Sequence, residues 1–258
     1  MFGRETLLQG PVLDVAGGKG ELAFQLMALN GCDTVVVDPR PLRCEPFHRL
    51  LLKGVFHRAK DAASTVDCAQ PALDAALNAP RHVATLFTSQ LVDRSLSDAM
   101  RAAIFARLRA HTRRLSWTTT GLTATTDTHE YARDRLNVHC VRVPDDVQPS
   151  EAEWTDWREA ELTLESATMV VGMHLDQAAE AAVDFAVARG LPFAVVPCCV
   201  YQKEFSRRRF ADGRRVTTYE DLLEYLQQKH PAIERATLPI DGKNQVLFMR
   251  ATLPTSAS

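Results

Sequence analysis

Two acids and a cluster of glycines near the beginning of the chain have the types and spacing of a ligand-binding turn. Asp14 ends a short apolar run, and the next six residues include Gly17, Gly18 and Gly20. Glycine has no Cβ, so the backbone can turn sharply there and a ligand can lie directly against it. Asp38 ends a second β-rich run, where a carboxylate can accept hydrogen bonds from both hydroxyls of a ribose. The spacing therefore predicts a site for a nucleoside-containing ligand.

The residues around this turn predict the elements that position it. The run 12–15 is apolar apart from the acid and is typical of a strand, and apolar residues recur at helical spacing over 22–29. The start of that helix would present unpaired N–H groups to a ligand. The run 34–37 predicts a second strand, so the turn lies within one strand–helix–strand unit. A glycine-rich turn that binds nothing is the alternative interpretation.

The turn has the sequence D-V-A-G-G-K-G over residues 14–20 and resembles the first motif of class I S-adenosylmethionine-dependent methyltransferases, usually (D/E)-x-G-x-G-x-G. The resemblance implies S-adenosylmethionine as cofactor. It implies that the methionine and ribose part of this cofactor is held by Asp14, Ala16, Gly17, Gly18 and Gly20. It also implies that Asp38 holds the ribose hydroxyls. Ala16 stands where a glycine is usual in that motif.

Two later strands are predicted to end in residues that can do chemistry. The run 168–174 ends in Gly172-Met173-His174, and the run 192–200 contains Pro197-Cys198-Cys199. The carboxyl ends of parallel strands meet at one edge of a sheet, so both groups should face the same cleft as the glycine turn. The pairing of G-x-H with P-C-C resembles one branch of the class I methyltransferases. That branch includes the eukaryotic tRNA acceptor-stem 2′-O-methyltransferases and related methyltransferase-like proteins.

The sequence departs from this branch in two ways. The tRNA enzymes usually have G-x-H-x-C-G, whereas His174 is followed here by Leu175-Asp176-Gln177. The sequence also lacks their cysteine–histidine zinc modules. The resemblance covers residues 12–38 and 169–250 and leaves out the middle third. These departures bear on the tRNA substrate more than on the cofactor.

His174 and Asp176 are the candidate catalytic residues. A histidine with a pKa near neutrality can assist the deprotonation of an attacking hydroxyl. The alternative for His174 is a hydrogen bond to the neighbouring loop that shapes the pocket. The alternative for Asp176 is a cap on the helix that follows it.

Cys198 and Cys199 are adjacent, and no metal site is expected from them. Neighbouring residues of an extended strand point to opposite sides, whereas a tetrahedral zinc ion needs three or four converging ligands. Buried free cysteines are the prediction.

A basic loop follows the Pro-Cys-Cys strand and should overhang the cleft. Its basic residues are Lys203, Arg207, Arg208, Arg209, Arg214 and Arg215, and its aromatic residues are Tyr201, Phe205 and Phe210. Arginines that neutralise phosphates beside stacking aromatics suit an RNA substrate. We therefore take Arg207, Arg208 and Arg209 as candidate substrate contacts. A solvated charged loop is the alternative.

The remaining pattern predicts an α/β fold that is Rossmann-like, with a mostly parallel sheet that ends in an antiparallel β-hairpin, as the methyltransferase resemblance also implies. The further elements expected are a strand at 82–87, helices at 45–53, 96–111, 153–164, 177–189 and 219–229, and a hairpin at 235–250. Residues 1–258 are expected to form a single domain, with an insertion or elaboration around 112–150. Residues 59–80 are helix or loop.

Composition limits the class of protein. The chain has 258 residues, of which 46% are hydrophobic and 24% charged, which is ordinary for a globular protein. No apolar run approaches the roughly 20 residues needed to cross a bilayer, so no membrane partner is expected. The six cysteines form no CxxC pair, which predicts an intracellular location, cytoplasmic or organellar. The early start of the first strand leaves open a longer parent chain or an organellar leader. The net charge of −2 provides no general basic field.

Three functions follow from these observations. The first is an S-adenosylmethionine-dependent methyltransferase that acts on RNA through the 203–215 loop. The second is a catalytically silent methyltransferase-like scaffold that binds RNA or a protein assembly. The third is an NAD-linked oxidoreductase, which the glycine turn disfavours because a dinucleotide site usually has G-x-G-x-x-G.

Overall fold

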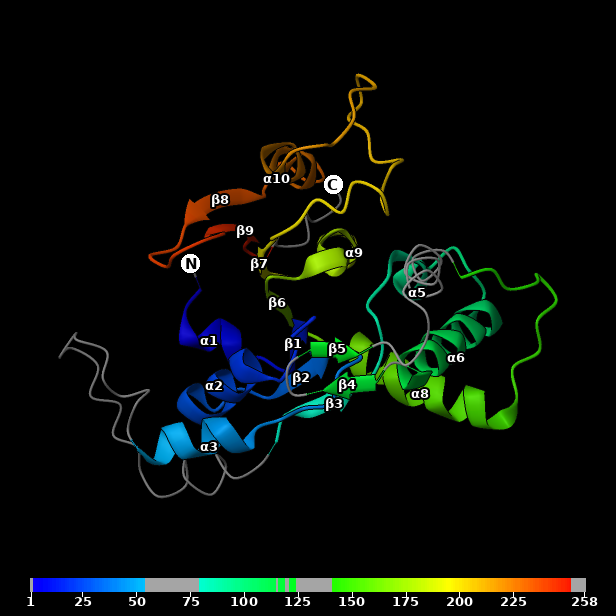
Figure 1. The fold of residues 1–258 in the computed structure, drawn as a ribbon, viewed down its shortest axis with the longest axis horizontal. Helices are drawn as coiled ribbons and strands as arrows, with labels where there is room; N and C mark the ends of the chain where they lie inside the picture. The colour runs from blue at the N-terminus through cyan, green and yellow to red at the C-terminus, as the bar shows by residue number, and fades with distance from the viewer. Residues whose placement is uncertain (1, 54–78, 115, 119–120, 124–140, 252–258) are drawn as a thin grey trace, which may run out of the picture.

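The computed structural model describes residues 2–53, 79–114, 116–118, 121–123 and 141–251. Its centre is a seven-stranded sheet with the strand order β3-β2-β1-β6-β7-β9-β8 (Figure 1). The strands are β1 (Val12–Val15), β2 (Thr34–Val37), β3 (Arg81–Val83), β6 (Met169–Met173), β7 (Phe193–Val196), β8 (Glu234–Thr237) and β9 (Gln245–Met249). The first five strands in that order are parallel, and β9 runs antiparallel to both β7 and β8. The predicted Rossmann-like α/β fold with a terminal hairpin is therefore confirmed.

Helices pack against both faces of this sheet. The helices of the described residues are α1 (Arg4–Leu7), α2 (Glu21–Asn30), α3 (Glu45–Leu52), α5 (Ser89–Val92), α6 (Asp98–Arg114), α8 (Glu151–Glu165), α9 (Ala179–Ala188) and α10 (Tyr219–Gln227). Val12 and Met169 point towards α1 and α2, whereas Leu13 and Val170 point towards α9 and α10. Burial on both faces explains why β1 and β2, apart from Asp14 and Thr34, are apolar at successive positions instead of alternating.

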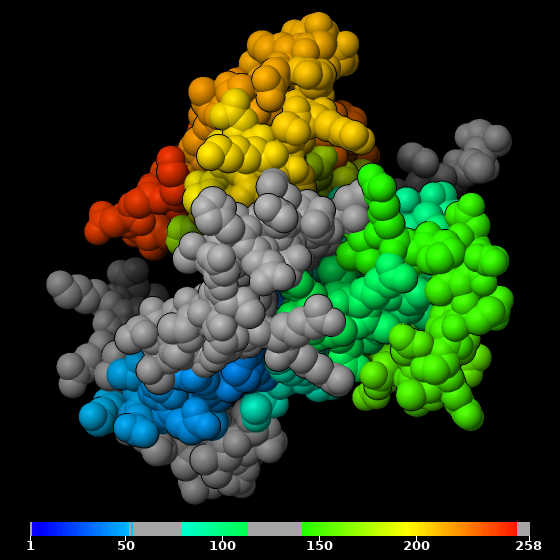
Figure 2. Space-filling view, turned by 45° about the vertical axis from the view of Figure 1, so that its right-hand side comes forward, coloured from blue at the N-terminus to red at the C-terminus, as the bar shows by residue number. Residues whose placement is uncertain are grey.

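A helix pair forms a second core beside the sheet. Trp157 of α8 is fully buried against Ile104, Phe105 and Leu108 of α6. Ion pairs reinforce the contact between the two helices, including Arg109 of α6 with Asp156 of α8. Figure 2 shows this part of the molecule, in green, as a bulge beside the N-terminal segment in blue.

The range 112–150 contributes no strand to the seven-stranded sheet in its described part. The strands β4 (Ser116–Thr118) and β5 (Gly121–Thr123) pair only with each other, antiparallel. The expectation that this range is an insertion stays a prediction. Residues 59–78, for which helix or loop was expected, lie outside the described residues.

Two predicted strands are shorter in the structure. The strand predicted at 82–87 pairs with β2 only over 81–83, because the chain turns directly after it: the N–H of Thr85 donates to the carbonyl of Val83 at 2.9 Å. The strand predicted at 192–200 ends at Val196. Pro197 follows and has no N–H to continue a ladder. The cysteines at 198 and 199 therefore lie in the loop beyond β7.

Gly172 in β6 is required by close packing, so its replacement by alanine should destabilise the fold. A Cβ at this position would lie 2.6 Å from Cγ of Leu175 and 2.8 Å from the carbonyl oxygen of Val15. We expect Gly172→Ala to lower the free energy of unfolding by about 1–3 kcal/mol, as overpacking does, in urea denaturation.

The matched control is Gly3→Ala, since a Cβ there meets nothing within 4 Å. Its free energy of unfolding should stay within about 0.5 kcal/mol of the original. Equal urea midpoints for Gly172→Ala and Gly3→Ala would contradict the conclusion that close packing requires glycine at position 172.

Candidate functional site

The glycine turn joins the end of β1 to the start of α2, as the sequence predicts. Gly18 and Gly20 have positive φ of 60° and 86°, a region that glycine enters without strain. Gly17 is required by close approach instead, because a Cβ there would lie 2.4 Å from Oδ2 of Asp14. Ala16 has a φ of 55° although it carries a side chain. Backbone strain of this kind is concentrated at functional sites.

Asp14 is buried beside this turn with only part of its hydrogen-bonding capacity used. Its Oδ2 accepts a hydrogen bond from the backbone N–H of Ala23, at 3.2 Å. Its Oδ1 has no hydrogen-bond partner within the described part of the chain. Burial raises the pKa of this carboxyl from 3.8 to about 7; the bond from Ala23 opposes the rise, and the charge of Asp38 adds to it. A buried acceptor without a partner is costly, so Oδ1 is suited to accept a bond from a ligand.

Asp38 is also buried, but all of its acceptor positions are filled by the protein itself. Its Oδ2 accepts from the backbone N–H of Gly18 and from Nη2 of Arg40, each at 2.9 Å. Its Oδ1 accepts from the backbone N–H and from Nε of Arg40, at 2.8 Å and 2.9 Å. A carboxylate offers about four acceptor sites in total. The hydroxyls of a ribose can therefore reach Asp38 only if the Arg40 guanidinium moves away.

Arg40 is the residue of this site that the sequence analysis missed. Its guanidinium lies across the turn, since a Cβ at Gly18 would be 3.1 Å from its Nη2. The side chain is 42% exposed, so it can swing out into solvent. The hydrogen bond to Asp38 raises the pKa of Arg40, and the charge of Asp176 adds to this effect. The sequence does show a basic residue two positions after the acid that ends the second strand, and this spacing could have indicated the ion pair.

The ends of β6 and β7 share this edge of the sheet with the turn. In the described ranges, four non-glycine residues have positive φ, namely Ala16, His174, Asp176 and Tyr201. Each of them follows β1, β6 or β7, which run parallel to one another. The imidazole of His174 is exposed, and the backbone N–H of His174 donates to the carbonyl of Val196 at 2.9 Å. His174 is thus accessible to a ligand at the edge.

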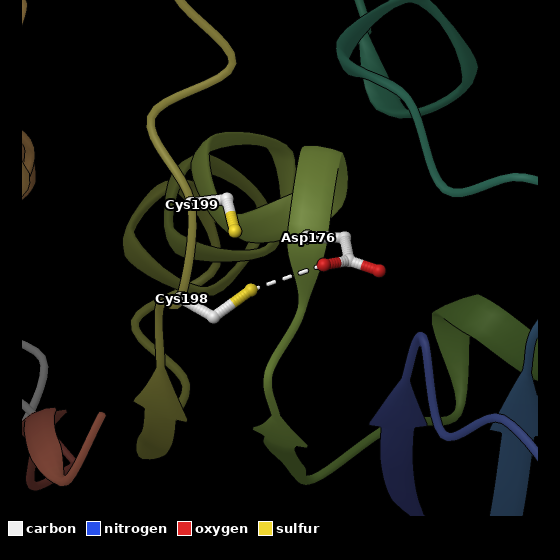
Figure 3. A group of neighbouring side chains, drawn as sticks. All are labelled: Asp176, Cys198 and Cys199. Atoms are coloured by element: carbon white, nitrogen blue, oxygen red, sulfur yellow. Dashed lines mark hydrogen bonds between the residues drawn. The ribbon is translucent and has the colours of Figure 1, made fainter. Parts of the chain in front are cut away.

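Asp176 does not cap the following helix, so that interpretation is wrong. It is the first residue of a short 3₁₀ turn, Asp176–Ala178, whose N-cap is Leu175, and no side chain caps either this turn or α9. Its exposed carboxylate instead accepts a hydrogen bond from Sγ of Cys198, at 3.0 Å. Figure 3 shows this contact between the loops after β6 and β7.

The two cysteines are neither buried in a strand nor on opposite sides of it, contrary to the prediction. Cys198 is half-buried and Cys199 is exposed. One ligand atom each from Asp176, Cys198 and Cys199 lies within 4.8 Å of the other two. The geometric reason for expecting no metal therefore does not hold. Burial, followed by the Asp176 carboxylate, raises the pKa of the Cys198 thiol.

The three candidate arginines of the basic loop differ in their surroundings. Arg207 and Arg209 are exposed, whereas Arg208 is buried. Arg208 donates from Nε to Glu180 at 2.6 Å, and its guanidinium lies 3.6 Å from the centre of the Phe205 ring. Arg208 therefore anchors the loop, and only its neighbours are open to a substrate.

Glu180 is the other half of this anchor and was not foreseen from the sequence. It accepts hydrogen bonds from Arg208, from the hydroxyl of Tyr225 at 2.6 Å and from Nζ of Lys229 at 3.0 Å. Burial alone would raise the pKa of Glu180, but the charges of Arg208 and Lys229 lower it. Phe210 is buried against Tyr225, so its ring is not open to a nucleotide base.

Comparisons of the chain with protein families, with curated proteins and with solved structures find no match. The geometry defines a Rossmann-like α/β protein with carboxylates, a histidine and two thiols at the carboxyl edge of its sheet. Within the ranges that the structure describes, no helix has both the length and the apolar character required to cross a lipid bilayer.

The raised pKa of Asp14 should make stability depend on pH. A carboxyl whose folded pKa lies above its unfolded value contributes stability below pH 4, and this contribution is lost as pH rises through about 7. We expect the free energy of unfolding to fall over this interval, by at most about 1.4 kcal/mol per pH unit from this group.

Urea denaturation of the unaltered protein and of Asp14→Asn, whose side chain cannot ionise, at pH 5, 6, 7 and 8 checks this prediction. The difference between their free energies of unfolding should change steadily up to pH 7 and level off above it. A difference that does not vary with pH would show that Asp14 titrates normally.

Proposed function

We propose that the protein is an S-adenosylmethionine-dependent methyltransferase that acts on RNA. The observation that carries the proposal is the buried, unpartnered Oδ1 of Asp14 beside the glycine turn. S-adenosylmethionine is a cation-bearing donor, with a sulfonium and an ammonium group. A buried carboxylate with a free acceptor atom favours such a ligand, because an opposite charge stabilises its ionised form.

The same carboxylate argues against a dinucleotide. The pyrophosphate of NAD lies at the helix start that follows the first strand, and here this position adjoins the buried carboxyl of Asp14. An ionised carboxylate next to a pyrophosphate would repel it. The reversed strand β9, between β7 and β8, also differs from the parallel order of a dinucleotide fold and agrees with the methyltransferase resemblance.

The sheet supports a ligand at this edge. From β1 the chain proceeds outwards to β2 and β3, and it later returns to the other side of β1 with β6 and β7. Ligands of open α/β sheets bind outside the carboxyl ends of the strands, where the order reverses. The turn after β1 and the His174 segment after β6 flank this point.

The residues of the chain can be assigned roles in methyl transfer. When bound, S-adenosylmethionine supplies an electrophilic methyl group for in-line displacement. Asp14 would bind a cationic part of the donor, and Asp38 would accept its ribose hydroxyls once Arg40 has moved. His174 would accept the proton of an acceptor hydroxyl. The remaining contribution of the protein is alignment of the two reactants.

Arg40 should compete with the donor, because both bond the same oxygens of Asp38. We expect Arg40→Ala to increase the affinity for S-adenosylmethionine by about tenfold, as the loss of a competing charge-assisted hydrogen-bond pair implies. Isothermal titration calorimetry measures the affinity for S-adenosylmethionine, and NAD is the comparison ligand. The control variant is Arg49→Ala, since Arg49 is an exposed arginine of α3.

Tighter binding of NAD than of S-adenosylmethionine would overturn the cofactor assignment. Weaker donor binding in Arg40→Ala would show that Arg40 is a contact and not a competitor. No donor binding in either protein would favour the silent scaffold, which the filled acceptor positions of Asp38 also fit.

RNA is proposed as the substrate because the basic loop projects from the sheet beside the site (Figure 1). Five of its basic residues are exposed, namely Lys203, Arg207, Arg209, Arg214 and Arg215. Arg214 is less available, since it pairs with Asp221 and Glu224 of α10. Exposed cations suit contacts with phosphates, which carry most of the affinity for nucleic acids.

Charge reversal should separate RNA binding from donor binding. We expect Arg207→Glu combined with Arg209→Glu to weaken RNA binding at least about tenfold and to reduce its salt dependence, in filter binding at several salt concentrations. Donor affinity should not change. Arg208 is left intact because it anchors the loop.

The matched control is Arg158→Glu, a charge reversal at an exposed arginine of α8. Equal loss of RNA affinity in this control would indicate a nonspecific charge effect. Unchanged RNA affinity in the double variant would exclude the loop as the substrate contact.

A further inference from the structure

A group of side chains that can ligate a metal lies at the ends of β6 and β7, on the edge of the sheet that also carries the proposed donor site. The two strands are in register up to Met173 and Val196, so the loops that follow leave the sheet side by side. Asp176 comes from the first loop, and Cys198 and Cys199 come from the second. Figure 3 shows both sulfurs and the carboxylate turned towards a common space.

The geometry points to a zinc site formed by Asp176, Cys198 and Cys199. One oxygen and two sulfurs lie within 4.8 Å of one another, and Sγ of Cys198 is 3.0 Å from Oδ1 of Asp176. Tetrahedral zinc with ordinary bond lengths separates sulfur and oxygen ligands by about 3.6 Å and two sulfurs by about 3.8 Å. A bound zinc ion would therefore require the Cys198 sulfur and the Asp176 oxygen to move apart by about 0.6 Å.

The donor set selects the class of metal. Thiolates bind zinc and other soft or borderline ions, whereas calcium and magnesium require a shell of oxygen ligands. Three protein ligands leave the fourth tetrahedral position for water or another group, as in zinc sites that are not closed. The exposure of Asp176 and Cys199 gives the ion a path from solvent.

Tyr201 lies near the carboxylate ligand, since burial, followed by the charge of Asp176, raises the pKa of this tyrosine. A hydroxyl next to a ligating carboxylate can orient it in a metal site. A bound ion would connect the loop after β6 to the loop after β7. This inference does not require the donor site, so either proposal can fail without the other.

The first test is a zinc titration of the metal-free, reduced full chain against a chromophoric zinc indicator. We expect one zinc ion per chain. Loss of a supporting residue lowers metal affinity by about 10- to 100-fold, and Cys199→Ser or Asp176→Asn, which removes a ligand itself, should lower it at least that much. Cobalt(II) should give sulfur-to-metal charge transfer and the visible bands of a tetrahedral ion, and both should vanish in Cys198→Ser with Cys199→Ser.

Stability gives a second readout. Zinc should raise the melting temperature of the unaltered chain by several degrees, because a ligand that binds only the folded state stabilises it, and should leave the Cys199→Ser variant unchanged. Circular dichroism of the metal-free variants checks that they are folded.

Controls separate this site from the other thiols. Cys32→Ser changes a buried cysteine elsewhere in the described structure and should retain the ion. Cys68 and Cys140 lie outside the described residues, so Cys68→Ser with Cys140→Ser should also retain it. Absence of stoichiometric zinc binding overturns the proposal, as does binding that persists without Cys198 and Cys199 or that disappears without Cys68 and Cys140.

Discussion

The parallel pairing of β1 with β2 on one side and with β6 on the other is the constraint on which the rest of the structure depends. Leu13 is paired with Val35 and with Val170, and all four residues of β1 are buried. This pairing places the strand ends at one edge, where the glycine turn, Asp38 and the loop after β6 become neighbours. Without it these residues, which are far apart in the sequence, would have no common site.

Three acidic residues illustrate how neighbours determine what a carboxylate can do. Asp14 keeps one oxygen free, and burial raises its pKa to about 7. Asp38 is saturated by Arg40 and Gly18. Glu180 is saturated by cations and a hydroxyl, and its pKa is lowered although it is largely buried. Desolvation and opposite charges act in opposite directions on the same group. Of these three acids, Asp14 is the one that keeps an acceptor atom without a partner in the described residues.

Long periodic segments were predictable because their pattern is local. The helices expected at 96–111 and 153–164 are present as α6 and α8, with ends that differ by a few residues. Strand ends were less predictable, because they depend on which neighbour a strand finds. The edge strand β3 and the strand before Pro197 are both shorter than their apolar runs suggest.

By itself, the sequence determined the turn after β1, the continuous apolar strands and the α/β order, since each follows from side chains close along the chain. Only the tertiary structure decided which polar groups meet. The carboxylate of Asp176 reaches Cys198 across 22 residues, and Glu180 reaches Arg208 across 28. Such contacts depend on the path of the folded backbone between two segments, and this path cannot be predicted from the local composition of either segment. For this reason the position of the candidate site could be expected from the sequence, whereas the contacts of Arg40, Arg208 and Cys198 could not.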